Sequence, residues 1–453
     1  MQGFGISHLA GAAVSRTAAT ARSLVAHPRA PIAALVVVLV LSAAARVADL
    51  GAPCASPCKR SSDYTLIFDE SYYVNAARVI DRIHPPRSAP YHDAPLGKDP
   101  NSEHPQLAKL VMAAGIEVFG DGPWGWRLGS LVFGLVAVAA MYALARAAGA
   151  GPWLAVAASA VMALDNLPLV HGRIATLDIY ALALMLVAGA LYLRRAHLLA
   201  GIALGLAAAM KLVALYLIPA LFLIELFAFA VARPRRGDRL RRALAQLRPF
   251  AVSCVVAIGS FVLLVWLLDS LVPAYNPGSH AVYGGNPFRH IGHMLSYAAS
   301  LKSVPHATGI SSSPWQWLLD KKEISYARTA VNVMSGGRIT ASHALISFRG
   351  AVNPFVIAMA IPALFAAAAA AWRESDRLAL VGVAWCLGTY VPFVVQADAL
   401  HRVTYLYYVL IVLPGVYLVT VRLFASRQMP VAATVGWAVA LVYGFVDLYP
   451  LRG

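Results

Sequence analysis

The sequence predicts an all-α, polytopic membrane protein. Hydrophobic residues make up 60% of its 453 residues and charged residues only 13%, which leaves too few polar side chains to cover a soluble protein of this length. The apolar residues gather in blocks of about twenty, the length with which a helix crosses a hydrocarbon core. Inside lipid the backbone must satisfy its own hydrogen bonds, so these blocks are expected to be helices.

Eleven apolar segments are expected to span the membrane. They lie at about residues 31–50, 126–148, 153–171, 174–193, 197–210, 212–231, 249–269, 354–372, 378–397, 403–422 and 430–448. The first is long for the core of a signal peptide and is interpreted as a retained anchor. The boundary between the fifth and sixth, at Lys211, is the least marked.

Basic residues predict the orientation. With the N-terminus and a basic arm (residues 1–30) in the cytoplasm, all the basic short loops fall on the cytoplasmic side, as the positive-inside bias requires. These loops contain Arg146, Arg194, Arg195, the segment from Arg233 to Arg248, Arg373, Arg377, Arg422 and Arg427. The net charge of +16 therefore does not indicate a nucleic-acid partner. An Ala- and Arg-rich composition favours a bacterial plasma membrane.

The same alternation places two long segments outside the cytoplasm, at about residues 51–125 and 270–353. Short apolar stretches at 104–119 and 286–301 are expected to form helices on the membrane surface. Residues 31–453 would then form one membrane domain. No internal repeat is evident, which argues against an inverted-repeat transporter.

The first outer segment carries an acidic pair, Asp69 and Glu70, in a chain with only 21 acidic residues against 37 Lys and Arg. Neighbours on a helix point about 100° apart, so the two carboxylates are expected to have different roles. One could act as a general base while the other caps a helix, binds an acceptor or helps to hold a metal. The alternative is that the pair marks a helix N-terminus, where acids are favoured.

Two further polar groups lie at the same face. His104 and Lys109 lead into the first surface helix, where they could serve a site or simply cap the helix and reach the headgroups. Asp165, Arg173 and Asp178 lie at the outer ends of two predicted spans. Ionisable residues at membrane depth are usually functional. Arg173 could bind a phosphate in bidentate fashion or pair with Asp178.

Cations and tryptophans complete the candidates at the outer face. Lys211, His401 and Arg402 come from separate spans, and together they would suit an anionic lipid headgroup, although each could be a membrane anchor. Trp315 and Trp317 could form a stacking surface for a sugar or a lipid, but Trp is common at membrane interfaces in any case.

Cysteines and histidines give weaker signals. Cys54 and Cys58 share the first outer segment, where a disulfide is possible if that segment is extracytoplasmic. His290 and His293 are three residues apart, as metal ligands on a helix can be, but no third ligand matches them. A divalent metal is therefore possible and is not demanded, and no cofactor is required.

Taken in order, these segments resemble the protein O-mannosyltransferases and their bacterial relatives, which are lipid-carrier-dependent glycosyltransferases of the C-type membrane fold. The resembling segments are Phe68–Tyr73, His104–Lys109, Trp126–Ser130, Asp165–Asp178, Gly205–Lys211, Ser313–Leu318 and Arg402–Tyr408. Two motifs depart from the family. Its His-Pro-Pro-Leu-Gly-Lys reads His104-Pro105-Gln106-Leu107-Ala108-Lys109, and its Leu-Tyr-His-Tyr reads Leu406-Tyr407-Tyr408-Val409.

The resemblance implies an inverting transfer of a sugar, mannose by analogy, from a polyprenyl-phosphate carrier to an acceptor hydroxyl such as Ser or Thr of a secreted protein. Asp69 would take the acceptor proton. Arg173, Lys211 and Arg402 would bind the donor phosphate, with Arg127 as a further candidate. The reaction would take place at the extracytoplasmic face of the plasma membrane.

The remaining candidates would orient the acceptor or the cations. They are Glu70, classed with Asp69 as catalytic, and His104, Lys109, Asp165, Asp178, Trp315, Trp317, His401 and Tyr407. Two alternatives stay open. A related branch adds aminoarabinose to lipid A, so the acceptor could be a lipid. A transporter of lipid-linked sugars would use the same cations without chemistry.

Overall fold

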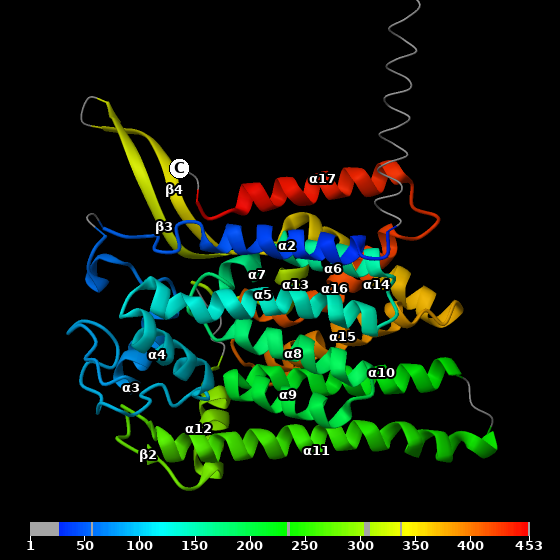
Figure 1. Ribbon diagram of the computed structural model, residues 1–453, viewed down its shortest axis with the longest axis horizontal. Coiled ribbons are helices and arrows are strands. Elements are labelled where there is room, and N and C mark those ends of the chain that lie inside the picture. The colour runs from blue at the N-terminus through cyan, green and yellow to red at the C-terminus, as the bar shows by residue number, and fades with distance from the viewer. Residues whose placement is uncertain (1–26, 56–57, 233–235, 303–308, 336–337, 452–453) are drawn as a thin grey trace, which may run out of the picture.

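The computed structural model describes residues 27–55, 58–232, 236–302, 309–335 and 338–451. Most of the predicted basic arm, including Arg16 and Arg22, lies outside these residues. Apolar helices lie side by side and make up most of the described chain (Figure 1). The predicted polytopic helical architecture is confirmed.

Within the described residues, seven helical segments are long and apolar enough to cross a membrane. They are α2 (Ala30–Val47), α5 (Pro123–Ala147), a 3₁₀ turn with α10 (Leu212–Tyr216 and Leu217–Ala232), α11 (Arg239–Leu271), α14 (Pro354–Arg373), α15 with a π-helical turn (Arg377–Val394 and Val395–Ala399) and α17 (Val431–Leu448). Four shorter apolar helices accompany them: α6 (Pro152–Ala163), α8 (Asp178–Leu193), α9 (His197–Met210) and α16 (Leu413–Phe424). All eleven predicted segments are therefore helical, and the number that cross the membrane stays a prediction.

Several predicted spans have different limits in the structure. The segment 403–422, for example, begins as a 3₁₀ turn at Leu406 and becomes α16 at Leu413. The segment 153–171 breaks between α6 and the short α7 (Asn166–His171), where Asp165 caps the second helix by accepting a hydrogen bond from the backbone N–H of Leu167. The basic segment before residue 249 is not wholly a loop, because α11 already begins at Arg239. At 1.5 Å per residue, α11 is about 50 Å long and exceeds the hydrocarbon core.

The basic loops gather at one end of the helices. Arg377 donates a hydrogen bond to the Leu193 carbonyl at 3.1 Å, which joins the start of α15 to the end of α8. Arg422 pairs with Glu374 and Asp376, each at 2.8 Å. In Figure 1 the ends of α10 and α14 lie at the right, opposite α3 (Glu70–Ile80) and α4 (Leu107–Phe119) at the left. This grouping agrees with the charge asymmetry, and which end faces the cytoplasm stays a prediction.

The outer segments are ordered and contain the expected surface helices. The stretch 104–119 forms α4, and the stretch 286–301 forms α12 (Pro287–Ser300). Asn286 caps α12 by accepting a hydrogen bond from the backbone N–H of Phe288. A short helix, α13 (Pro314–Leu318), begins at Ser313.

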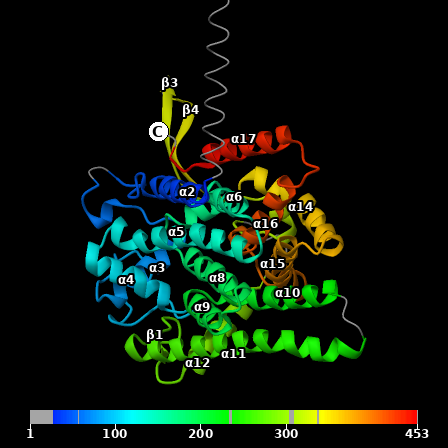
Figure 2. The same cartoon turned by 45° about the vertical axis from the view of Figure 1, so that its right-hand side comes forward.

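Two antiparallel hairpins are additions to the predicted all-α fold. The short pair is β1 (Ala274–Tyr275) and β2 (Val282–Tyr283). The long pair, β3 (Ile324–Ser335) and β4 (Arg338–Gly350), sets Ile324 opposite Gly350 and projects away from the helices (Figures 1 and 2). The β-branched residues of these strands and the Gly336–Gly337 pair between them are hairpin signals that the sequence does carry.

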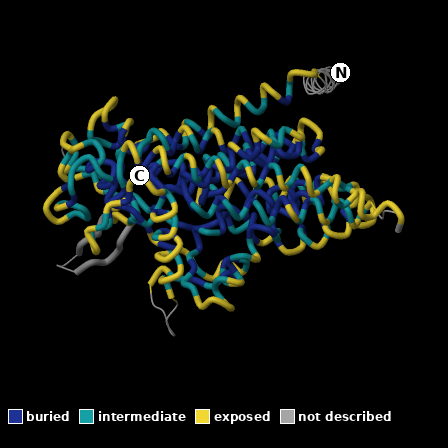
Figure 3. The backbone as a smooth tube through the Cα atoms, turned by 90° about the horizontal axis from the view of Figure 1, so that it is seen from below, coloured by how far each residue is buried: buried dark blue, intermediate teal, exposed yellow. Residues whose placement is uncertain are grey.

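Burial follows the arrangement of the helices. The tube in Figure 3 is dark blue through the middle of the molecule, and α8 is buried along nearly its whole length. In contrast, α2 and α17 expose apolar side chains such as Val40 (60% exposed) and Val439 (64% exposed). Such faces suit lipid as their solvent.

Candidate active site

A cavity of about 530 Å³ opens among the first outer segment, the junction of α9 and α10, α12 and the chain that follows α15. Its titratable lining includes Asp69, Glu103, His104, Lys211 and Arg402. Tyrosines make up much of the rest: Tyr72, Tyr73, Tyr91, Tyr216, Tyr297, Tyr405, Tyr407 and Tyr408. The size is that of a small-molecule site, and its apolar walls carry a few convergent polar groups.

Asp69 is placed by an unusual turn. The preceding residue, Phe68, has a φ of 54°, in the left-handed region that bulky residues rarely adopt. The Phe68 ring stacks on Tyr326 at 4.3 Å between centroids and meets the Tyr407 ring edge-on at 5.7 Å. Helix α3 then begins at Glu70, with Asp69 at its N-cap. The turn presents Asp69 to the cavity and directs Glu70 into the core.

Glu70 has a structural environment, which differs from the predicted catalytic one. Its carboxylate accepts backbone hydrogen bonds from Ile67 and Ala175, both at 2.7 Å. It also forms a two-pronged ion pair with Arg127 at 2.8 and 2.7 Å, and both side chains are buried. Neither Glu70 nor Arg127 lines the cavity. Asp69 and Glu70 therefore lie at a helix N-terminus, as the alternative interpretation of this acidic pair predicts. Of the two carboxylates, only that of Asp69 faces the cavity.

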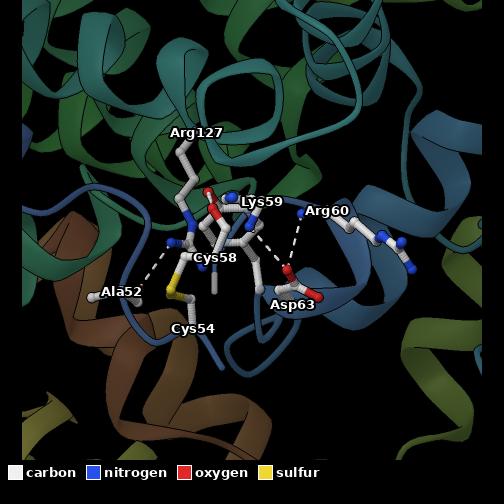
Figure 4. Close-up of a disulfide and its surroundings, with 8 residues drawn as sticks. Ala52, Cys54, Cys58, Lys59, Arg60, Asp63 and Arg127 are labelled. Atoms are coloured by element: carbon white, nitrogen blue, oxygen red, sulfur yellow. Dashed lines mark hydrogen bonds between the residues drawn. A yellow bond between two sulfur atoms is a disulfide. The ribbon is translucent and has the colours of Figure 1, made fainter. Parts of the chain in front are cut away.

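Arg127 likewise binds protein groups and not the cavity, in contrast to the phosphate-binding role expected of it. Its Nη1 donates to the carbonyls of Leu50 and Ala52 at 2.6 and 3.0 Å. The neighbouring loop is closed by a disulfide between Cys54 and Cys58, as the sequence allowed (Figure 4). Arg127 thus joins α5, α3 and the disulfide loop.

Lys211 lies at the break between α9 and the following 3₁₀ turn, where its backbone is extended. Its ammonium donates to Asp178 Oδ1 at 2.7 Å and lies 5.2 Å from the centre of the Tyr407 ring. Lys211, which marks the boundary between the fifth and sixth predicted spans, therefore lies in the cavity wall. Asp178 pairs with this cation and is not the partner of Arg173.

Arg402 is the second cation of the cavity. Its Nε donates to the Ala298 carbonyl at 2.7 Å, and its Nη1 donates to Gln396 Oε1 at 2.9 Å. The guanidinium carbon lies 5.8 Å from the centre of the Tyr408 ring. Within the described chain Nη2 has no hydrogen-bond partner, so it can bind a ligand. His401 is exposed, has a φ of 49° and does not line the cavity.

The Asp69 carboxylate makes no hydrogen bond or ion pair with any described residue. Burial raises its pKa to about 6, the Lys211 charge opposes this shift, and the Asp178 charge adds to it. A carboxylate with such a pKa is mostly ionised at pH 7 and is a stronger base than an ordinary aspartate. The cavity therefore contains a carboxylate that is unpartnered among the described residues, together with two cations.

His104 faces the cavity as a neutral imidazole. Burial lowers its pKa well below the usual range, and the charges of Lys211, Lys109 and Arg402 lower it further. Its ring lies 5.9 Å from Tyr73 and 6.5 Å from Tyr297 between centroids. His104 can thus donate or accept a hydrogen bond, but it adds no positive charge at pH 7.

Lys109 supports the cavity from behind and does not reach the headgroups. It is buried against Asp99 at 2.5 Å and donates to the carbonyls of Asn101 and His104 at 2.6 and 3.1 Å. It fixes the segment that leads into α4.

Arg173 is outside the cavity, which corrects its predicted place beside Lys211 and Arg402. Its guanidinium donates to the carbonyls of Ala45 and Ala48 at 2.8 and 2.6 Å and to the Tyr449 hydroxyl at 3.1 Å. These partners lie at the ends of α2 and α17. Arg173 therefore binds helix ends together, and no phosphate could reach it without displacing them.

Asp165 is also outside the cavity. Its carboxylate accepts hydrogen bonds from the backbone N–H of Asn353 at 3.0 Å and from the Tyr417 hydroxyl at 2.8 Å. It connects α7, α14 and α16 and has no place in the site.

The two tryptophans have different environments. Trp317 is buried and donates to Ser312 Oγ at 2.8 Å, and its ring lies 5.6 Å from Phe393, which lines the cavity. Trp315 is 52% exposed and lies beside Lys321. Trp317 therefore supports the cavity wall, whereas Trp315 remains free to meet a ligand or lipid.

Sequence reasoning missed several lining residues, above all Glu103, Tyr297 and Gln396. Glu103 begins the polar stretch that leads through His104 to Lys109, and the sequence assigns no role of its own to it. Tyr297 and Gln396 carry no sequence signal, because only the fold brings α12 and the end of α15 to this cavity. In the described parts of the chain, no three His, Cys, Asp or Glu side chains are grouped so that they could hold a metal ion.

The sequence matches the family described as dolichyl-phosphate-mannose-protein mannosyltransferase over residues 36–265, more than half of the chain. The polyprenol-phosphate-mannose–protein mannosyltransferase of Corynebacterium glutamicum is 26% identical over 334 residues, which are 60% of this chain and 62% of that protein. The protein of the same description from Mycobacterium tuberculosis is 24% identical over 450 residues, 85% of this chain and 83% of that protein.

A solved structure shares the fold. The Saccharomyces cerevisiae protein O-mannosyltransferase Pmt1-Pmt2 complex bound to the sugar donor matches with a TM-score of 0.65 at 12% identity, over 93% of this chain and 90% of that chain. The expected C-type membrane fold and the resemblance read from the motifs are both confirmed. The chain belongs to the dolichyl-phosphate-mannose-protein mannosyltransferase family.

Proposed function

We propose that the protein transfers a mannosyl group from a polyprenyl-phosphate carrier to a hydroxyl group of a protein. The observation that carries this proposal is the single cavity that holds the unengaged Asp69 carboxylate together with Lys211 and Arg402. A displacement in which a phosphate is the leaving group needs a base to deprotonate the attacking hydroxyl and cations to stabilise the charge on the phosphate. The names of the similar proteins support mannose as the sugar and a protein as the acceptor.

The proposed reaction is one in-line displacement. Asp69 takes the proton from the acceptor hydroxyl as its oxygen attacks the anomeric carbon. The bond between that carbon and the phosphate oxygen breaks, and its electrons leave with the polyprenyl phosphate. Lys211 and Arg402 stabilise the charge on the departing phosphate. Attack from the face opposite the phosphate inverts the anomeric configuration, and this chemistry requires no cofactor.

A reconstituted assay tests the proposal. The purified protein in nanodiscs would be given polyprenyl-phosphate-[¹⁴C]mannose with a Ser/Thr-rich secreted polypeptide, and separately with a lipid extract. We expect label in the polypeptide, bound through an α-linkage if the donor is β-linked. Label only in lipid would favour lipid glycosylation. Movement of the intact donor across the bilayer without any transfer would indicate a transporter.

The orientation is part of the proposal. The basic loops gather at the end opposite α3 and α4 (Figure 1), so the cavity is proposed to face the extracytoplasmic side. Cysteines introduced at Arg82 and Arg373 test it in spheroplasts: an impermeant maleimide should label the first and spare the second. The reverse labelling would invert this topology.

Activity should depend on the ionisation of Asp69. Because the pKa of Asp69 is about 6, the base form dominates above pH 6 and is lost as the pH falls through that value. We expect kcat/KM for the donor to fall about tenfold per pH unit below about pH 5.5 and to be level from 6.5 to 8. Initial rates of transfer at constant ionic strength check this profile. A profile flat down to pH 4.5 would contradict the assignment.

Arg402 should act on the donor phosphate. We expect Arg402→Met to lower kcat/KM for the donor about 100-fold, since a charged donor to the leaving group is lost. Arg402→Lys should recover only part of this loss, because an ammonium cannot make the same paired contacts. Arg373→Met, at the exposed end of α14, is the matched control and should keep the wild-type rate. Wild-type kinetics in Arg402→Met would remove Arg402 from the site.

A further inference from the structure

The cavity contains a second carboxylate, Glu103, which the proposed displacement does not use. It is half-buried in the cavity wall, and its Oε2 accepts a hydrogen bond from Asn101 Nδ2 at 3.1 Å. Burial and then the Glu103 charge raise the pKa values of Tyr91 and Tyr297, so both hydroxyls keep their protons beside it. The Asn101 amide and two neutral tyrosine hydroxyls therefore lie near Glu103.

The segment that carries Glu103 is fixed from one side by Asn101. Lys109, paired with Asp99, donates to the main-chain carbonyl of Asn101 at 2.6 Å and to its side-chain oxygen at 3.3 Å. The Asn101 amide donates in turn to the Tyr91 hydroxyl at 3.1 Å and to Glu103. The buried Lys109 ammonium therefore fixes the orientation of the Asn101 amide, and this amide fixes the orientation of the Glu103 carboxylate.

A second buried group fixes the same segment from the other side. Asp269 accepts a hydrogen bond from Gln106 at 2.8 Å, and its carboxyl group is hydrogen-bonded to His290 Nδ1 at 2.9 Å. His290 Nε2 donates to the Ser102 carbonyl at 3.0 Å. Residues 99–106 are thus held at both ends, which removes most of the ordering cost of using Glu103 in binding.

The chemistry of this wall suits the hydroxyl groups of a sugar. A carboxylate can only accept hydrogen bonds when ionised, and it repels a phosphate, so its ligand must be a donor. The tyrosine hydroxyls that line the same wall can both donate and accept hydrogen bonds. Building on the mannosyl transfer proposed above, we propose that Glu103 is a specificity-determining residue that accepts hydrogen bonds from hydroxyls of the transferred sugar. Asn101 and Lys109 are its positioning residues.

A binding measurement separates this role from catalysis. Polyprenyl-phosphate-mannose and bare polyprenyl phosphate would each be titrated against the protein in nanodiscs. Because a charge-assisted hydrogen bond is lost, we expect Glu103→Gln to weaken binding of the mannosylated lipid about tenfold. Binding of the bare phosphate should change less than twofold. Glu117→Gln, on the exposed face of α4, should change neither affinity, and thermal melting checks that each variant is folded.

The outcomes are distinct. Equal weakening of both lipids, or no change in either, would overturn the role of Glu103. Glu103→Asp keeps the charge on a shorter side chain, and it should recover part of the affinity for the mannosylated lipid if the carboxylate is what matters. Selective loss of the mannosylated lipid by Glu103→Gln supports the inference even if the wild-type protein transfers no mannose to a polypeptide. That last failure would count against the proposed function alone.

Discussion

Asp69→Asn is expected to lower mannosyl transfer about 1000-fold, which is within the range for loss of a general base. The amide has nearly the shape of the carboxylate but cannot take a proton from the acceptor. Because Asp69 has no partner among the described residues, the substitution leaves no buried cation or backbone group newly unpaired. We therefore expect the thermal midpoint and the affinity for the donor lipid to stay close to wild type. Initial rates with saturating donor measure the effect.

Asp81→Asn is the matched control. Asp81 lies at the other end of α3 and does not line the cavity, so its substitution tests the loss of a carboxylate from the same helix. It should keep at least half of the wild-type rate. A transfer rate in Asp69→Asn within tenfold of wild type would show that another group takes the proton, and the proposed mechanism would fail.

Breaking the Glu70–Arg127 ion pair is expected to destabilise the fold, in addition to any loss of transfer activity. Removal of one partner leaves the other as a buried, unpaired charge, which destabilises a fold by about 3–5 kcal/mol. Glu70→Gln and Arg127→Met should each lower the thermal midpoint in detergent sharply. The double variant should be less destabilised than the two single effects together, because no charge is then left alone.

An exposed ion pair provides the comparison. Glu374, 65% exposed, pairs with Arg422 at the other end of the helices, and Glu374→Gln should change stability by less than about 1 kcal/mol. If Glu70→Gln keeps the wild-type thermal midpoint but loses transfer, Glu70 has the catalytic role that the sequence first predicted. The structural assignment of the pair would then be wrong.

The adjacent acids show what a sequence can and cannot predict. The motif Phe68–Tyr73 predicts a site at this point, and its residue Asp69 lines the cavity. Which carboxylate faces the cavity depends on the left-handed backbone of Phe68 and on its stacking against Tyr326. Tyr326 is more than 250 residues away in the chain, so no local pattern reveals that contact.

The two arginines at the outer ends of predicted spans show the same limit of sequence-based prediction. Arg173 and Arg402 both lie at the outer ends of predicted spans, and the sequence treats them alike. In the structure the Arg173 guanidinium is taken up by carbonyls at the end of α2, whereas Arg402 keeps an open side toward the cavity. The number of free carbonyls near an arginine depends on how helix ends pack, which hydropathy does not encode.

Hydropathy alone predicts the limits of helices whose length and composition are set by the surrounding lipid. The predicted segment 197–210 coincides with α9, and the segment 354–372 differs from α14 by one residue. Lipid imposes length and apolarity on such helices directly. The β3–β4 hairpin lies outside this constraint, and a search for apolar blocks does not detect its strands.

The most direct measurement is a structure of the Asp69→Asn protein with polyprenyl-phosphate-mannose bound. The account predicts the phosphate within hydrogen-bond distance of Lys211 and Arg402, with the anomeric carbon facing residue 69 and the sugar hydroxyls toward Glu103. A phosphate bound elsewhere would contradict it, whether beside Arg173 or in a separate cavity that is lined by residues including Glu225 and Arg377.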